Sequence, residues 1–80
     1  MSGTAITNQI RRLRFEHGEM TQQELAERVG VTRQTINAIE AGKYSPSLEV
    51  AFRMAEIFGV RVDQVFHYGG AAQGAKDGVP

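Results

Sequence analysis

The chain has 80 residues, with nine Lys or Arg against nine Asp or Glu, and therefore a formal net charge of zero at pH 7. This length leaves room for one domain. The charge balance argues against a protein that coats nucleic acid by bulk charge, although it allows a local basic surface. Cysteine is absent, which excludes a disulfide framework, a thiolate zinc site and a thiol nucleophile.

Targeting and catalytic signals are weak. The first residues have no apolar run ahead of a cleavage site, and no stretch approaches the roughly 20 apolar residues of a membrane-spanning helix. We therefore expect a cytoplasmic protein without membrane contact. The two histidines, His17 and His67, lie far apart in the chain, and no cluster of metal ligands is visible. We expect neither an enzyme nor a metal or other cofactor.

Apolar residues at helical spacing predict a first helix over residues 7–17. Ile6, Ile10 and Leu13 follow one another at i, i+4 and i+7, the spacing of an amphipathic helix. Gly18 is expected to end this helix, because glycine readily adopts the left-handed conformation that closes many helices.

The next two helices have clear starts and ends. Thr21 is a natural N-cap, and Glu24 three residues later completes a capping box. This helix is expected to stop at Gly30. Another begins almost at once with Thr32 as its cap and ends at Gly42. The sequence therefore predicts two helices joined by a turn of minimal length.

A fourth helix is expected after Ser47, which would cap it, or after Ser45 with Pro46 as its first helical residue, and before Gly59, which would close it. Its apolar residues cover a wide stripe, so we expect it to be the central helix of the core. The stripe consists of Leu48, Ala51, Phe52, Ala55 and Phe58, widened by Val50, Met54 and Ile57.

The end of the chain carries less information. A short last helical turn is expected over residues 62–68. The Gly- and Ala-rich residues 69–80 predict a disordered tail, and residues 1–5 a flexible N-terminus. Strand signals are weak, so residues 6–68 are expected to form one all-α domain of five short helices with no sheet.

Two helices joined by a short turn that contains glycine are typical of the helix-turn-helix unit. The stretch QQELAERVGVTRQTINAIEAGK resembles the Cro/repressor-type helix-turn-helix regulators, also called XRE-like. Gln22 opens the first helix, Ala26 lies where the helices touch, and Gly30 lies in the turn, as the family pattern requires. The resemblance extends over residues 6–68. It implies a compact five-helix, lambda-repressor-like DNA-binding domain and a transcriptional regulator.

The second helix of this unit has an outward edge suited to reading base pairs. In the major groove, Arg matches the two acceptors of guanine, Gln or Asn matches adenine, and methyl groups can touch thymine. The N-terminal residues of such a helix reach the base edges. The residues expected to contact bases are Thr32, Arg33, Gln34, Asn37 and Ala38.

Phosphate contacts are expected around this edge. Gln22 lies in the first turn of its helix, where free N–H groups favour an anion, and the resemblance also implies a phosphate contact there. Lys43 and Tyr44, in the loop after the recognition helix, are expected to contact phosphates too. Arg11 and Arg12 could reach the backbone, but such a pair is more often a solvated face.

The resemblance also implies a structural ion pair between Arg14 of the first helix and Glu40 at the end of the recognition helix. Glu40 would otherwise repel DNA. We expect the pair to be partly buried and to brace the recognition helix.

One helix reads only a few base pairs, so we expect a homodimer that binds a palindromic operator on double-stranded DNA, most simply as a repressor. The residues assigned to its interface are Val62, Val65, Phe66 and Tyr68, although some of them could instead close the core of the single chain. An antitoxin or a coactivator-like module that binds a partner protein with the same fold remains the alternative.

Overall fold

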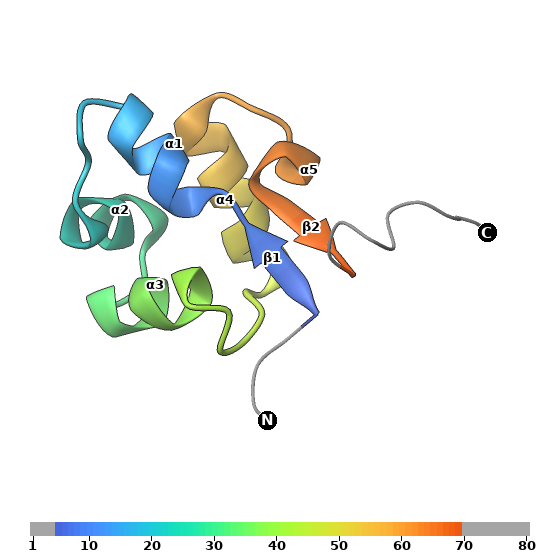
Figure 1. Cartoon of the computed structure of the whole chain (residues 1–80). Coiled ribbons are helices and arrows are strands. Elements are labelled where there is room, and N and C mark those ends of the chain that lie inside the picture. The colour runs from blue at the N-terminus through green and yellow to red at the C-terminus, as the bar shows by residue number, and fades with distance from the viewer. Residues whose placement is uncertain (1–4, 70–80) are drawn as a thin grey trace.

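The computed structural model describes residues 5–69 of the chain. The elements follow in the order β1 (Ile6–Asn8), α1 (Ile10–Glu16), α2 (Gln22–Val29), α3 (Arg33–Glu40), α4 (Leu48–Phe58), α5 (Val62–Val65) and β2 (Phe66–Tyr68), as Figure 1 shows. The prediction of five short helices is confirmed. The flexible N-terminus and the disordered tail expected from the sequence lie almost entirely outside the described residues.

The expectation that the domain has no sheet was wrong. β1 and β2 pair as an antiparallel ribbon, with Ile6 opposite Tyr68 and Asn8 opposite Phe66. Ile6 therefore belongs to a strand, and α1 starts only at Ile10, whose N–H donates to Asn8 Oδ1 at 3.1 Å. The ribbon joins the two ends of the described chain, and such a non-local pairing leaves no helical or alternating pattern in so short a segment.

The helix starts predicted from hydroxyl caps are confirmed. Thr21 Oγ1 accepts from the N–H of Glu24 at 3.0 Å, and Glu24 Oε1 accepts from the N–H of Thr21 at 2.8 Å, which completes the capping box. Thr32 and Ser47 cap α3 and α4 in the same way. Gly30 follows α2 with a φ of 90°, a left-handed conformation that lets the chain turn at once into α3.

All five helices contribute to one apolar core. Its buried members are Ile10, Leu13, Met20, Leu25, Ala26, Val29, Ile36, Ile39, Met54, Ala55, Phe58 and Val65. The predicted stripe on α4 was partly wrong, because Leu48 and Phe52 are 72% and 56% exposed. Apolar residues cover more than one face of α4, so their spacing alone did not reveal which face the other helices bury.

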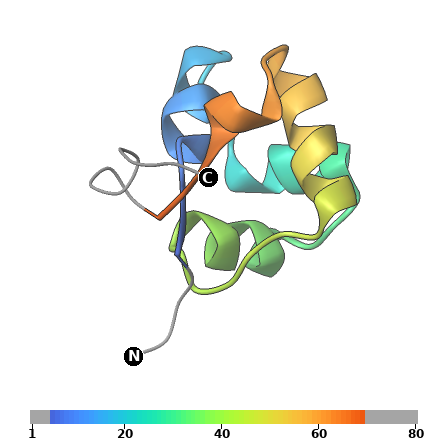
Figure 2. The ribbon, with the colours of Figure 1, turned by 90° about the vertical axis from the view of Figure 1, so that its right-hand side faces the viewer.

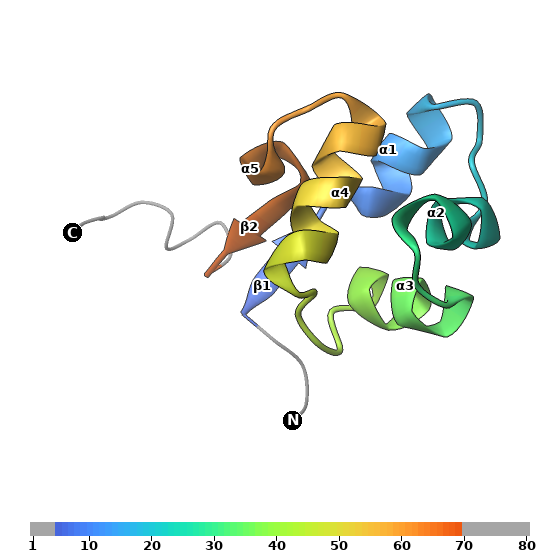
Figure 3. The ribbon, with the colours of Figure 1, turned by 180° about the vertical axis from the view of Figure 1, so that it is seen from behind.

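The helices are arranged so that α3 lies along one side of the molecule. In Figures 2 and 3, α3 (green) lies at the bottom of the molecule, and α1 (blue) and α5 (orange) lie above it. The α2–α3 turn and the loop that leads to α4 hold the two ends of α3. Among residues 5–69, no helix has the length and apolar character needed to cross a membrane.

Candidate nucleic-acid interface

The recognition helix α3 has one buried and one exposed face. Ile36 and Ile39 are 0% and 2% exposed and anchor the helix to the core. The opposite face carries residues expected to contact bases, of which Thr32, Arg33, Gln34 and Asn37 are exposed and Ala38 is half-buried. Since the two isoleucines fix the rotation of α3 about its axis, they also fix which residues point outward.

Thr32 has a second role at the start of this helix. Its hydroxyl oxygen accepts from the N–H of Thr35 at 3.2 Å, and the hydroxyls of the two residues lie 3.0 Å apart. The polar group of Thr32 is therefore engaged in capping α3. Beside this cap, Arg33, Gln34 and Asn37 line a shallow hollow on the exposed face of the helix.

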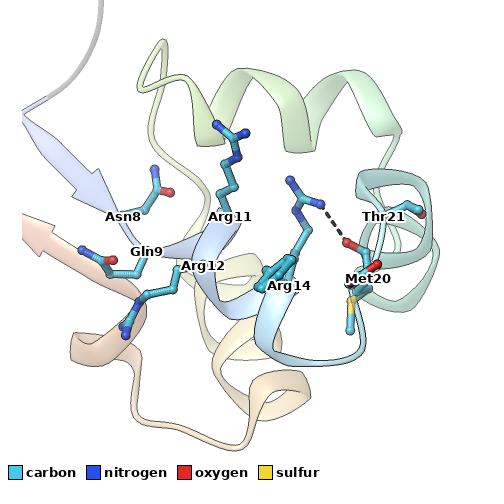
Figure 4. Close-up of a pocket in the computed structure, with 9 residues that line it drawn as sticks. Asn8, Gln9, Arg11, Arg12, Arg14, Met20 and Thr21 are labelled. Carbon is cyan, nitrogen blue, oxygen red and sulfur yellow. Dashed lines mark hydrogen bonds between the residues drawn. The ribbon is translucent and has the colours of Figure 1, made fainter.

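Arg14 and Glu40 join α1 to the last residue of α3. Arg14 Nε donates to Glu40 Oε2 at 2.6 Å and Arg14 Nη2 donates to Glu40 Oε1 at 3.1 Å, a two-point contact. The side chains are 16% and 10% exposed. Arg14 Nη1 also donates to the carbonyl oxygen of Met20 at 2.7 Å (Figure 4). The pair occupies the charge of the one carboxylate in α3.

Gln22 extends this contact into a network that the sequence did not reveal. Its Nε2 donates to Glu40 Oε1 at 3.1 Å, and its Oε1 accepts from Asn37 Nδ2 at 3.4 Å. The first residue of α2 is thereby linked both to the ion pair and to the outward face of α3. The separate roles of these residues were visible in the sequence, but their contact depends on the crossing geometry of α2 and α3.

Two further contacts at helix ends were also missed. Asn8 Nδ2 donates to the carbonyl oxygen of Ile39 at 3.0 Å, which attaches the end of β1 to the C-terminal turn of α3. Arg53 Nη1 on α4 donates to the carbonyl oxygen of Val29 at 3.0 Å, at the end of α2. Helix-end carbonyls need such donors, but the sequence does not indicate which distant side chain supplies them.

The loop after α3 is held close to the end of that helix. The N–H of Lys43 donates to the carbonyl oxygen of Ala38 at 2.9 Å. The side chains of Lys43 and Tyr44 are both exposed there. A cationic and a hydroxyl group are therefore exposed in the loop that directly follows α3.

The residues assigned to a dimer interface differ in exposure, and one assignment has to be corrected. Val65 is fully buried in the core of the single chain, so it has no surface to offer a partner. Val62 and Phe66 are half-buried and pack against the same core. Tyr68 is 78% exposed. Of the four residues of α5, only Val65 is buried. The apolar pattern of the sequence did not distinguish Val65 from Val62.

A helix-turn-helix in which the first helix supports the second, and the second presents a polar face to solvent, is the architecture of helix-turn-helix DNA-binding domains. Comparison with known families agrees with this architecture. The model of a helix-turn-helix family matches residues 10–65. The chain belongs to this XRE-type helix-turn-helix family.

Relatives give the class of function. The chain is 49% identical over 63 residues to an uncharacterized HTH-type transcriptional regulator of Methanocaldococcus jannaschii, covering 79% of this chain and 94% of the relative. It is 36% identical over 60 residues to the cryptic phage CTXphi transcriptional repressor RstR of Vibrio cholerae, covering 75% and 53% respectively.

A similar fold is found in SinR, the master regulator for biofilm formation from Bacillus subtilis, in its complex with DNA. The TM-score is 0.60 at 30% sequence identity, with 66% of this chain and 84% of the SinR chain covered. The protein is therefore a transcriptional regulator with a helix-turn-helix DNA-binding fold, and not an enzyme.

Proposed function

We propose that the protein is a homodimeric repressor that inserts α3 into the major groove of a palindromic operator. The observation that carries this proposal is the composition of α3. Its exposed face presents a guanidinium and two amides at Arg33, Gln34 and Asn37, and its one carboxylate, Glu40, is held by Arg14. A face that meets only water has no need of such an arrangement.

Each outward side chain has a matching base edge. Arg33 is suited to the two acceptors of guanine, and Gln34 and Asn37 to the donor and acceptor of adenine. Ala38 and the methyl group of Thr32 suit the methyl group of thymine. Arg33 and Gln34 are the principal readers, because they lie in the first turn of α3, which goes deepest into the groove in this type of docking.

Phosphate contacts position the helix without specifying sequence. Gln22 uses one amide hydrogen for Glu40, and the second remains to donate to a phosphate oxygen. Lys43 and Tyr44, in the loop that follows the C-terminal end of α3, serve the same purpose. In this scheme, the start of α2 and the loop after α3 each hold the DNA backbone beside the recognition helix.

The dimer and the repressor role rest on different supports. A single α3 spans a few base pairs, and a two-fold dimer reads two half-sites about 34 Å apart. Val62, Phe66 and Tyr68 supply the proposed interface, with Tyr68 as its most exposed member. The similarity to a phage repressor supports repression. A protein of this kind acts in the cytoplasm.

A second candidate is a module that binds another protein, in the manner of an antitoxin or a coactivator. The observation in its favour is the exposure of Leu48 and Phe52, which lie one turn apart on α4. These apolar side chains belong to α4 and not to α3, so a protein partner on them and DNA on α3 are compatible.

Selection of bound duplexes from a random library tests the proposal. The full chain is incubated with the library at about 0.15 M salt, and bound duplexes are amplified and sequenced through several rounds. Enrichment of an inverted repeat with half-site centres about 10 base pairs apart is expected. No enrichment over the starting library would contradict sequence-specific binding and favour the protein-interaction module. A single, non-repeated half-site would contradict the dimer alone.

A further inference from the structure

The cations of residues 5–69 fall into two groups. Arg12, Arg14, Arg53 and Arg61 each form an ion pair with a carboxylate. Within the same described range, no ion pair forms at Arg11, Arg28, Arg33 or Lys43. Arg33 and Lys43 already belong to the proposed interface. Two unpaired cations are left that the recognition helix and its loop do not account for, Arg28 in the last turn of α2 and Arg11 on α1.

Contacts on both sides of Arg11 fix its location. Three residues before it, Asn8 Nδ2 donates to the carbonyl oxygen of Ile39. Three residues after it, Arg14 forms the ion pair with Glu40. Arg11 and Arg14 also share one face of α1, since residues three apart are neighbours on a helix. Arg11 therefore lies beside the C-terminal turn of α3.

The neighbouring Arg12 is placed differently. Figure 4 shows Arg11 and Arg14 extending from α1 toward α3, whereas Arg12 extends the opposite way. Arg12 Nη1 lies 3.7 Å from Glu16 Oε2, so its charge is already paired along its own helix. The two adjacent arginines, which look equivalent in the sequence, thus extend in opposite directions and differ in ion pairing, although both line the groove beside α1.

An open groove lies alongside α1 at this place. Its wall includes Asn8, Arg11, Arg14 and Thr21, and also Glu19, whose carboxylate disfavours an anion nearby. In Figure 4 Arg14 lies between Arg11 and Met20, the residue next to Glu19. The end of the groove that suits an anion is therefore the Arg11 end, close to where Asn8 contacts the C-terminal turn of α3.

A cation beside the C-terminal end of α3 would favour the approach of a phosphate. Helix carbonyls carry partial negative charge at this end, and that charge disfavours a phosphate nearby. Arg11 from α1 and Lys43 from the following loop both lie next to it. Two cations from separate segments offset the negative end of the helix at the point where the DNA backbone would pass.

We propose that Arg11 binds a phosphate of the DNA backbone and, with Lys43, holds that strand at the C-terminal end of α3. This inference rests on the proposed docking of α3 in the major groove. It assigns to the start of α1 a positioning role in DNA binding, which adds one phosphate contact per chain without adding base specificity.

The test compares Arg11→Gln with Arg12→Gln in the full chain, since both remove one positive charge from adjacent positions. Dissociation constants are measured at salt concentrations between about 50 and 200 mM, on the duplex enriched from the random library and on an unrelated duplex. Arg11→Gln should reduce the slope of log K against log salt by about 0.9 per bound chain on both duplexes. Arg12→Gln should leave the slope unchanged.

Thermal unfolding of each variant separates DNA contact from fold stability. Equal slopes for the wild type and both variants overturn the inference, as does a lower Tm for Arg11→Gln with an unchanged slope, because Arg11 would then only stabilise the helix end. If the wild-type chain selects a duplex and Arg11→Gln binds it like the wild type, this inference fails while the proposed function stands. If the wild type binds no duplex, both fail.

Discussion

Arg14 and Glu40, 26 positions apart in the chain, meet through two hydrogen bonds of 2.6 and 3.1 Å that connect α1 to the end of α3. The contact sets the position of the recognition helix relative to the rest of the domain and removes a free carboxylate from the proposed DNA surface. Gln22 adds a third hydrogen bond to the same carboxylate. Glu40 is thus the point where α1, α2 and α3 are joined.

Glu40→Ala is expected to destabilise the domain by roughly 3 kcal/mol, because it leaves the guanidinium of Arg14 largely buried without its partner. The free energy of unfolding in urea measures the effect. The matched control is Glu49→Ala, which breaks an ion pair to Arg53 whose side chains are 51% and 72% exposed. That change should cost less than about 1 kcal/mol. Equal losses for both variants would show that the Arg14 pair is not structurally special.

Ala26 lies where α2 and α3 approach each other and is fully buried. Ala26→Leu is expected to lower the free energy of unfolding by about 1–3 kcal/mol, because three more carbon atoms must fit between packed helices. Denaturant unfolding measures the loss. Ala41→Leu, at the exposed end of α3, adds the same atoms in solvent and should change stability by less than about 0.5 kcal/mol. An unchanged stability for Ala26→Leu would mean that the joint has spare room.

Tyr68 tests the proposed dimer interface. It is 78% exposed, so Tyr68→Ser should leave the fold of the single chain intact. If Tyr68 packs against a second copy, sedimentation should show a dimer for the wild type and a shift toward monomer for the variant, with little change in the far-UV circular dichroism. A wild-type monomer at micromolar concentration, free and on a palindromic duplex, would rule out the dimer.

Local features of the fold were predictable because their causes are local. The caps at Thr21, Thr32 and Ser47 each act within three residues, so the sequence revealed where α2, α3 and α4 start. The β1–β2 ribbon and the exposure of Phe52 were missed, because both depend on how distant segments pack.

The same division applies to the site. The spacing of Arg33, Gln34 and Asn37 on one helix was readable directly, since it requires only the helical period. The bonds from Gln22 to Glu40 and from Asn8 to Ile39 were not, because they cross between elements. The difference between Arg11 and Arg12 also emerged only in three dimensions, from where α1 meets α3.

The central claim is that the outward face of α3 reads bases. It is tested most directly by measuring the affinity of the wild type, Arg33→Ala and Lys43→Ala for the selected duplex and for duplexes with each base in turn at every half-site position. Arg33→Ala should lose about 1–3 kcal/mol on the selected duplex and lose its preference at one position, which we expect to be a guanine. Lys43→Ala should weaken binding to all duplexes alike and reduce the salt slope by about one. Equal loss for both variants on every duplex would contradict the claim.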